Sequence, residues 1–267
     1  MWLSYFSMNV SLTTSFDQLY SPQTLAEHNN RQHNIEAVSY ITNGLFSVLI
    51  NCMVLVVARM TKPYGKQMLL LSAFAFSVFL VSCGYLADGL RRVAYSNSRA
   101  GEMAIRQCFF VGVHLPLFYI GETAESFLLL HLSFDRFLAM ISPAFYSRLN
   151  FQVTKRCFLT EYAVAVASSV TMMVIIVVLY GDDVILAQCY FGDAIPKPIK
   201  KLHNYWYIVS GFISIVAYIV AVACCCYRRK STIGNRSAQC KREIKLTKRV
   251  ALIVVTTFLS GVFPLTL

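Results

Sequence analysis

Long apolar blocks constrain this chain more than any other feature of its sequence. Each block holds about twenty residues, enough for a helix to cross the ~30 Å hydrocarbon core of a bilayer. Charged residues make up 14% of the chain, whereas a soluble domain carries about 25%. Backbone groups in lipid must be hydrogen-bonded within the segment, so blocks of this length favour helices over barrel strands. The sequence therefore predicts an all-α membrane protein, with six helices at about residues 37–58, 67–87, 107–134, 157–180, 205–227 and 250–267.

Basic residues set the expected orientation of these helices. If the N-terminal segment (residues 1–36) lies outside and residues 37–267 form the bundle, the inner loops hold 16 of the 24 lysines and arginines. Inner loops are typically rich in Lys and Arg, so this orientation is the favoured one. The net charge of +11 then faces inner-leaflet lipid and does not indicate a nucleic-acid partner. The first 20 residues lack a basic stretch followed by an apolar core, so we expect no cleaved signal peptide.

The orientation also places two sequences that invite modification. Asn9-Val10-Ser11 lies outside and could accept a glycan. The cysteines at the inner end of the fifth block precede basic residues, which suits palmitoylation, although they could equally be small packing residues. They are Cys224, Cys225 and Cys226. We expect no cofactor and no metal site, because the nine cysteines form no C-x-x-C pair and most lie within apolar blocks.

The stretch SFDRFLAMISPAFY, residues 133–146, closes the third block at its inner end. An arginine at such a place can be an anchor that extends toward the lipid headgroups. The whole stretch, however, resembles the D-R-Y-x-A-I-x-x-P-L-x-Y signature of rhodopsin-like G-protein-coupled receptors, with Phe137 in place of the first tyrosine. The positions that match in identity and spacing are Asp135, Arg136, Ala139, Pro143 and Tyr146. The resemblance implies a heptahelical-receptor-like bundle in which Arg136, restrained by Asp135, turns toward a heterotrimeric G protein on activation.

Two other blocks carry weaker matches to these receptors. In the first block, Asn51 fits the family's G-N-x-x-V, and an asparagine in an apolar helix normally faces other helices. In the sixth block, Phe258 and Pro264 fit F-x-x-C-W-x-P, where the proline either acts as a hinge or only bends the helix. The resemblance also implies an acidic partner for Arg136. Glu243 stands one residue away from that position.

A disulfide between the third helix and the second outer loop is a further implication of the resemblance. Cys108 opens the third block and Cys189 lies in the loop sequence LAQCYFGD. Both lie on the oxidising side, so their pairing is chemically reasonable. Cys108 is three residues farther from Arg136 than is usual in the family, which is almost one helical turn, or ~4.5 Å. Either the cysteine lies one turn higher or a bulge absorbs the difference.

Two glutamates interrupt the third block in mid-membrane. The second block has no Asp where the family places one, around Ser77. Glu125 precedes Arg136 by 11 residues, which leaves the two about 20° apart around a helix, so both face inward. A carboxylate inside a bundle is costly and suggests a function. We hypothesise that Glu125 replaces the missing acid as a cation or proton site. The alternative is a protonated side chain that bonds to a neighbouring helix.

A ligand pocket is expected nearer the outer end of the third helix. Glu122 lies one turn closer to the outside than Glu125, and the residues that would line a pocket with it are His114, Phe118 and Tyr119. Glu161, near the inner end of the fourth block, is expected to extend toward the headgroups.

Short loops, divergent motifs and many aromatic residues make the chain similar to nematode serpentine chemoreceptors. The resemblance implies a plasma-membrane receptor, not an enzyme, that detects an extracellular small molecule and signals to a heterotrimeric G protein. The chain ends within or just after the sixth block, so we expect the seventh helix to be missing. The alternative is a six-helix transporter or channel subunit with an ion path through Glu122, Glu125 and His131. No repeat symmetry or filter-like loop supports this alternative.

Overall fold

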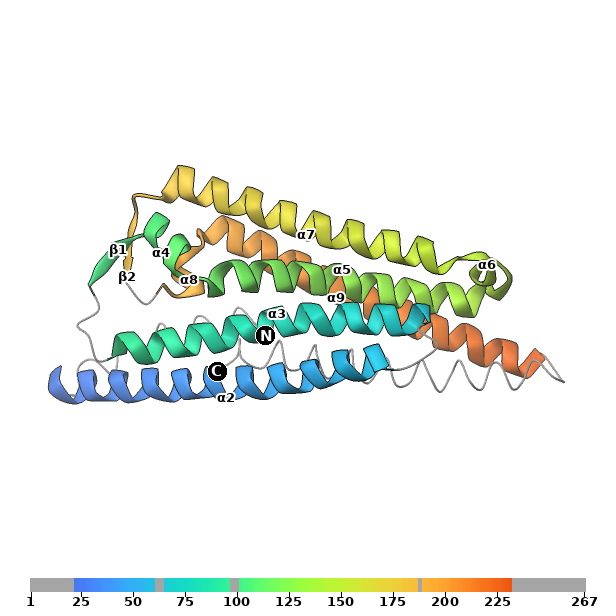
Figure 1. The fold of residues 1–267 in the computed structure, drawn as a ribbon, viewed down its shortest axis with the longest axis horizontal. Helices are drawn as coiled ribbons and strands as arrows, with labels where there is room; N and C mark the ends of the chain where they lie inside the picture. Colours follow the sequence, from blue (N-terminus) through green and yellow to red (C-terminus); the bar gives the residue numbers. More distant parts are fainter. Residues whose placement is uncertain (1–21, 61–64, 97–100, 187–188, 232–267) are drawn as a thin grey trace.

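Five long helices lie side by side along the molecule (Figure 1). The computed structural model describes residues 22–60, 65–96, 101–186 and 189–231. The long helices cover the first, second, fourth and fifth predicted blocks, whereas the third block (residues 107–134) begins on the short helix α4 and continues on α5. The sixth predicted helix, residues 250–267, lies outside the described residues. The five are α2 (Pro22–Met60), α3 (Lys66–Ser96), α5 (His114–Ile141), α7 (Phe151–Tyr180) and α9 (Lys197–Ser231).

Short elements mark the two ends of the bundle (Figure 1). One end holds β1 (Glu102–Ala104), α4 (Ile105–Val111), β2 (Val184–Leu186) and α8 (Phe191–Ala194). The two strands pair antiparallel, with Met103 opposite Ile185, and were not predicted from the sequence. We call this the disulfide end, because the Cys108–Cys189 bond lies here. Helix α6 (Pro143–Arg148) lies at the opposite end, which we call the α6 end.

Helix α5 is the centre of the bundle. It packs against α3, α7 and α9. A polar side chain on α5 therefore meets another helix in most directions and rarely meets lipid. An apolar cluster joins α5 to α3 and α9 and consists of Leu70, Ala73, Phe74, Leu128, Leu129, Leu132 and Tyr218.

Two interruptions set the ends of α5. Gly112 separates α5 from α4, and Cys108 lies on α4. This break in the helix accounts for the extra residues between Cys108 and the Asp-Arg motif, in place of the predicted bulge or one-turn shift. At the other end, Ser142 leaves the helix with φ −133° and ψ 72°. It does so because the residue before a proline, here Pro143, disfavours helical backbone angles.

Glycines let α2 and α3 approach closely. A Cβ atom at Gly44 would lie 2.7 Å from the backbone nitrogen of Leu86, and one at Gly89 would lie 2.9 Å from that of Ile41. Both distances are too short for any side chain. Small residues at such contacts are typical of helix packing in membranes, where close backbone approach gives the attraction.

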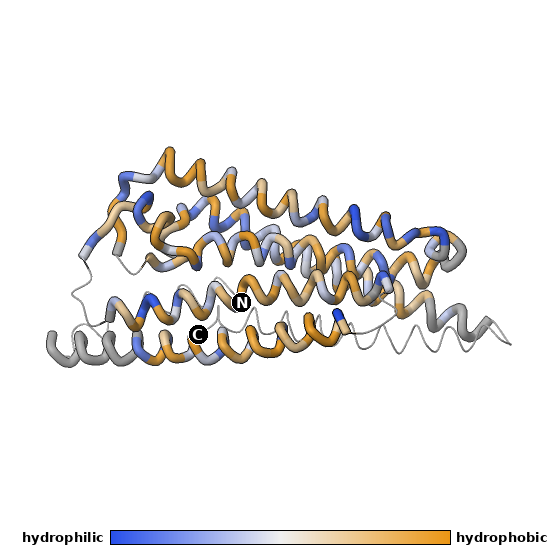
Figure 2. The backbone as a smooth tube through the Cα atoms, in the orientation of Figure 1, coloured by the Kyte–Doolittle hydropathy of each residue, from blue (hydrophilic) through white to orange (hydrophobic). Residues whose placement is uncertain are grey.

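The surface of the bundle is apolar, as expected for a protein in lipid. Four stretches within the described helices are long and apolar enough to cross a membrane: Asn34–Met60, Met68–Tyr95, Phe151–Tyr180 and Lys197–Cys224. Hydrophobic residues follow most of each long helix, whereas hydrophilic ones gather where α7 nears α6 (Figure 2). Helix α5 carries four charged residues and lies among the apolar helices. The predicted all-α membrane bundle is confirmed.

Candidate functional site

The Asp-Arg motif forms a buried ion pair at the α6 end of α5. The Arg136 guanidinium donates to Asp135 Oδ2 through Nε at 3.1 Å and through Nη2 at 2.5 Å. Arg136 is only 1% exposed and Asp135 only 7% exposed. An anchoring arginine would extend into the headgroups, whereas this side chain turns inward toward the acid beside it. The geometry thus favours a restrained arginine over an anchor.

Helix α6 adds a third member to the pair. Pro143 occupies the first turn of α6, where its missing N–H and fixed φ are tolerated. The helix turns the chain back so that the Tyr146 hydroxyl donates to Asp135 Oδ2 at 3.2 Å. The same hydroxyl accepts from Arg136 Nη2 at 3.4 Å. Phe137, the substituted position of the motif, packs against a small apolar cluster with Ala221 of α9.

A tyrosine that the sequence did not single out lies near this pair. Tyr218 of α9 is buried among leucines of α5 and lies within electrostatic range of Arg136. Its hydroxyl has no hydrogen-bond partner among the described residues. A buried hydroxyl without a hydrogen-bond partner is unfavourable, so Tyr218 keeps an unused donor and acceptor beside the pair. Nothing in the sequence distinguished Tyr218 from the other 14 tyrosines.

The two mid-membrane glutamates of α5 both bind side chains of α9. His203 Nε2 lies 2.8 Å from Glu122 Oε2, and the Tyr207 hydroxyl donates to Glu125 Oε1 at 3.4 Å. Residues three or four apart share one face of a helix, so two side chains from each helix meet in two successive layers. The ring of Tyr119 stacks on His203 with centroids 4.7 Å apart. Sequence reasoning missed both α9 partners.

The two layers differ in their exposure. Glu125 is 6% exposed, in agreement with the predicted inward face. The Glu122 side chain is 26% exposed, although its partner His203 is only 7% exposed. Among the described residues, no cationic side chain pairs with Glu125. Glu122 is therefore the more accessible carboxylate and Glu125 the more deeply buried one.

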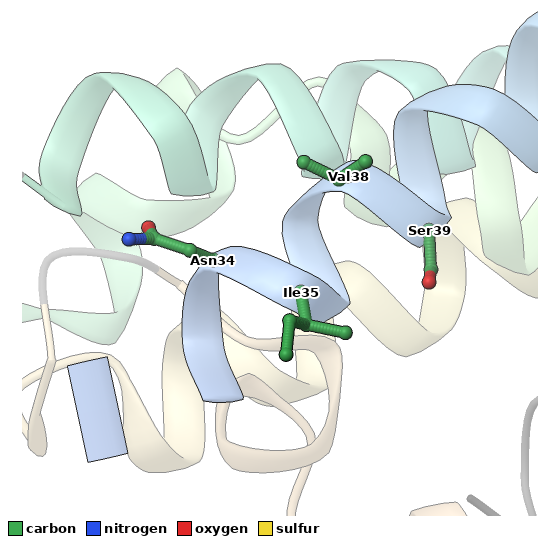
Figure 3. Close-up of a pocket in the computed structure, with 4 residues that line it drawn as sticks. All are labelled: Asn34, Ile35, Val38 and Ser39. Carbon is green, nitrogen blue, oxygen red and sulfur yellow. The ribbon is translucent and has the colours of Figure 1, made fainter. Parts of the chain in front are cut away.

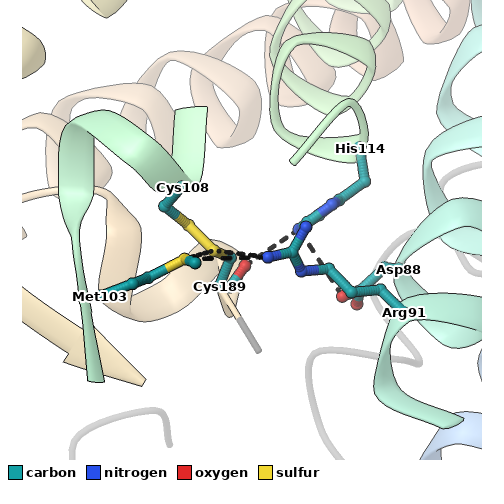
Figure 4. The surroundings of a disulfide bond; sticks show 6 residues. All are labelled: Asp88, Arg91, Met103, Cys108, His114 and Cys189. Atoms are coloured by element: carbon teal, nitrogen blue, oxygen red, sulfur yellow. Dashed lines mark hydrogen bonds and ion pairs between the residues drawn. A yellow bond between two sulfur atoms is a disulfide. The ribbon is translucent and has the colours of Figure 1, made fainter. Parts of the chain in front are cut away.

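The predicted disulfide between Cys108 and Cys189 is present, with Cα atoms 5.7 Å apart (Figure 4). Cys189 has a φ of 56°, in the left-handed region that non-glycine residues rarely adopt. Its carbonyl oxygen accepts from His114 Nε2 at 2.9 Å, and its sulfur lies 3.2 Å from Arg91 Nη2. These contacts hold the backbone of the loop in its unusual conformation against the start of α5.

The predicted pocket residues lie near this loop but face different neighbours. Phe118 packs edge-on against Tyr85 of α3 at 4.8 Å and against Phe191 of α8 at 5.5 Å. Tyr119, the next residue, faces α9, because successive helical residues are 100° apart. His114 is buried beneath the loop and bonds to it. The candidates therefore surround one end of the bundle and do not line a single wall.

A network of charges joins α2 to α3 at the disulfide end. Arg92 pairs with Asp88 at 3.0 Å and with Glu36 of α2 at 3.1 Å. Its guanidinium lies between the rings of Tyr40, at 4.3 Å, and Tyr190, at 4.6 Å. The other carboxylate oxygen of Asp88 is buried without a hydrogen-bond partner among the described residues. That oxygen lies 3.7 Å from His114 Nε2, so Arg92 provides the shorter contacts to this acid.

Glu161 corrects one prediction. Its side chain does not extend to the headgroups but accepts from His131 Nδ1 of α5 at 2.6 Å, and both side chains are largely buried. His131 follows Glu122 by nine residues, which places the two about 180° apart around α5. His131 therefore faces α7, whereas Glu122 faces α9. The predicted ion path through both glutamates and His131 would have to cross α5 itself.

Asn51 is half-buried and bonds within α2 to Ser47, which in turn contacts α3. Its amide donates to the Ser47 carbonyl at 2.8 Å and lies 3.3 Å from the Ser47 hydroxyl. That hydroxyl in turn bonds to Ser82 of α3 at 2.6 Å. The chain of polar groups crosses from α2 to α3.

Several predicted site residues cannot be placed in this geometry. Asn9, Glu243, Phe258 and Pro264 lie outside the described residues, so they stay predictions. Of the three cysteines at the end of α9, the structure describes the side chain of Cys224, which is a half-buried free thiol.

A shallow hollow lies on the surface of α2 near the disulfide end (Figure 3). It is lined by Asn34, Ile35, Val38 and Ser39. All four belong to one helix, and no predicted pocket residue is among them. We therefore do not assign a ligand to this hollow.

Comparison with known proteins agrees with the geometry. The chain matches no curated protein. A family model described as serpentine-type seven-transmembrane G-protein-coupled chemoreceptor Srsx matches residues 38–264. The match covers most of the chain, from within α2 to beyond the end of α9, and it confirms the resemblance read from the Asp-Arg motif. The chain therefore belongs to the Srsx family of serpentine chemoreceptors, which are G-protein-coupled receptors of the seven-transmembrane type.

Proposed function

We propose that this receptor resides in the plasma membrane, detects an extracellular small molecule and signals to a heterotrimeric G protein through Arg136. The observation that carries the proposal is the buried Asp135–Arg136 pair, closed by Tyr146 at the α6 end. A buried arginine that pairs with the acid beside it can be released by a small helix movement. Once released, it can interact with a partner protein.

The proposal assigns the two ends of the bundle to the two sides of the membrane. The disulfide end faces outside, where oxidising conditions preserve the Cys108–Cys189 bond. The α6 end faces the cytoplasm, where Lys155 and Arg156 of α7 are exposed, in keeping with the positive-inside rule. In this orientation Asn9 would be available for glycosylation, and Cys224 for palmitoylation.

The ligand is proposed to bind between the disulfide end and the middle of the membrane. Phe118 and Tyr119 offer aromatic surface there, and Glu122 offers an accessible carboxylate beside His203. A ligand that hydrogen-bonds to Glu122 would compete with His203 and so change the contact between α5 and α9. Glu125 lies one turn closer to the α6 end and is proposed as a cation or proton site. A change in the contact between α5 and α9 would also change the surroundings of Glu125.

A transporter or channel is the less favoured function. Its ion path would need polar groups along one continuous face. Glu122 and Glu125 bind α9 residues, whereas His131 binds Glu161 of α7. Each of these groups already has a partner on a neighbouring helix, which supports a role in holding helices together.

Recruitment of a G protein in cells tests the proposal. The receptor and its Arg136→Ala variant are compared at matched cell-surface levels, with a panel of Gα reporters and no added ligand. Arg136→Ala is expected to abolish recruitment. Arg148→Ala, which removes an exposed arginine from α6, serves as the matched control and should have little effect. Recruitment that is the same with and without Arg136 would contradict the proposal.

A further inference from the structure

We propose that Lys66 is a positioning residue that holds α6 against the bundle and, through Tyr146, keeps Asp135 and Arg136 paired. The inference rests on the proposed function, because it concerns the restraint on the same arginine. Sequence reasoning counted Lys66 only among the basic residues of the inner loops. Its contacts in the structure are far more specific than that role requires.

The first contact is between Lys66 and the last turn of α6. Lys66 is the first residue of α3, and its Nζ donates to the carbonyl oxygen of Leu149. The same Nζ lies 3.4 Å from the carbonyl oxygen of Tyr146. Leu149 is the C-cap residue of α6, and its N–H already donates to the Tyr146 carbonyl. A lysine ammonium is a suitable further donor to carbonyls at the C-terminal end of a helix. Lys66 therefore caps the C-terminal end of α6 from a different helix.

The second contact is between Lys66 and the side chain of Tyr146. The ammonium lies 4.5 Å from the centre of the tyrosine ring, within the range of a cation–π interaction. The hydroxyl at the far end of that ring donates to Asp135 and accepts from Arg136. One tyrosine thus joins the start of α3 to the end of α5.

The length of α6 makes these contacts important. The helix has six residues, and so short a helix is not stable in isolation. Its position depends on what it contacts, and Lys66 contacts both its backbone and the ring of Tyr146. Without the ammonium, the Tyr146 hydroxyl is less firmly placed. Asp135 then loses a donor, and the restraint on Arg136 weakens.

Ligand-free G-protein recruitment by the receptor tests this link. Lys66→Met is expected to raise recruitment about two- to ten-fold, the effect of losing roughly one net hydrogen bond from the resting state. Lys66→Arg keeps a cation that can bond to carbonyls and stack on the ring, so it should restore the low level. Lys155→Met removes an exposed lysine from α7 at the same end of the bundle and should leave recruitment unchanged.

A double-variant cycle separates positioning from a general structural effect. Tyr146→Phe keeps the ring and backbone that Lys66 contacts but removes the hydroxyl. In this background, Lys66→Met should cause no further rise. An equal rise in both backgrounds, or no rise in the unmodified receptor, overturns the inference. If Lys66→Met reaches the cell surface poorly, Lys66→Gln is used in its place, with the same expected changes in recruitment.

Failure of the inference differs from failure of the proposed function. If Arg136→Ala leaves recruitment intact, the function assigned to Arg136 is wrong whatever Lys66 does. If recruitment depends on Arg136 but ignores Lys66, only the positioning role is wrong.

Discussion

Replacing Arg92 with methionine is expected to destabilise the bundle strongly, because it leaves a buried acid without its partner. Asp88 is 2% exposed, and its Oδ1 has no hydrogen-bond partner among the described residues, the nearby His114 Nε2 being 3.7 Å away. Removing one member of a buried ion pair costs about 3–5 kcal/mol. Breaking the ion pair between Arg92 and Glu36 adds little. The Glu36 side chain is 43% exposed, and such a pair is worth about 0–1 kcal/mol. The lost ring contacts add about 0.5–1 kcal/mol each.

Arg106 provides a matched control for this change. Arg106 also pairs with an acid at the disulfide end, but its side chain is 59% exposed and that of its partner Asp182 is 87% exposed. Arg106→Met should therefore change the stability by less than about 1 kcal/mol. Both arginines form an ion pair, but only that of Arg92 is buried. The difference in stability between the two variants therefore measures the effect of burial.

Thermal unfolding of the purified receptor measures the difference. A thiol-reactive dye reports unfolding, because Cys52 and Cys83 are half-buried free thiols, whereas the exposed Cys157 reacts at the start. At about 2–4 °C per kcal/mol for a chain of this size, the cost of the broken buried pair alone should lower the midpoint by roughly 6–20 °C in Arg92→Met.

Adding Asp88→Asn to Arg92→Met should recover much of this loss, because a neutral amide is less costly to bury than a charge. The reasoning is refuted if Arg92→Met is no worse than Arg106→Met. It is equally refuted if the double variant unfolds at the same temperature as Arg92→Met alone.

Two further predictions concern the polar residues of α5. Glu125→Gln is expected to remove any effect of sodium on the unfolding temperature at constant ionic strength, because a neutral amide cannot balance a buried cation; a sodium effect that survives contradicts the cation site. His131→Leu is expected to destabilise the receptor by about 1–3 kcal/mol, because Glu161 loses its donor. Adding Glu161→Leu to His131→Leu should recover most of the lost stability. A double variant that is no more stable than His131→Leu would contradict this account.

Much of the architecture could be predicted from the sequence. Apolar blocks of about twenty residues have few stable folds in lipid other than helices. Four of the five long helices accordingly cover a predicted block, and α5 covers most of the third. The pairing of Cys108 with Cys189 followed from the resemblance to known receptors, and the bond is present. The shared inward face of Glu125 and Arg136 followed from helical geometry alone, because both lie on α5.

The partners of the polar residues could not be predicted. Glu161 was expected at the headgroups but binds His131, and neither His203 nor Tyr207 was recognised as a partner of the α5 glutamates. Each of these contacts joins two helices. It depends on how each helix is rotated about its own axis, which the pattern within one helix does not specify.

The features that the sequence determines therefore depend on residues close together in the chain, whereas the features that the tertiary structure decides depend on packing between helices. Membrane crossing and the relative angles of residues on α5 arise from interactions within a few residues, so they can be read from the chain. Which neighbour lies opposite each of those residues was decided only by packing. The same α5 helix presents one acid to a histidine of α9 and a histidine to an acid of α7, because different helices occupy its different sides.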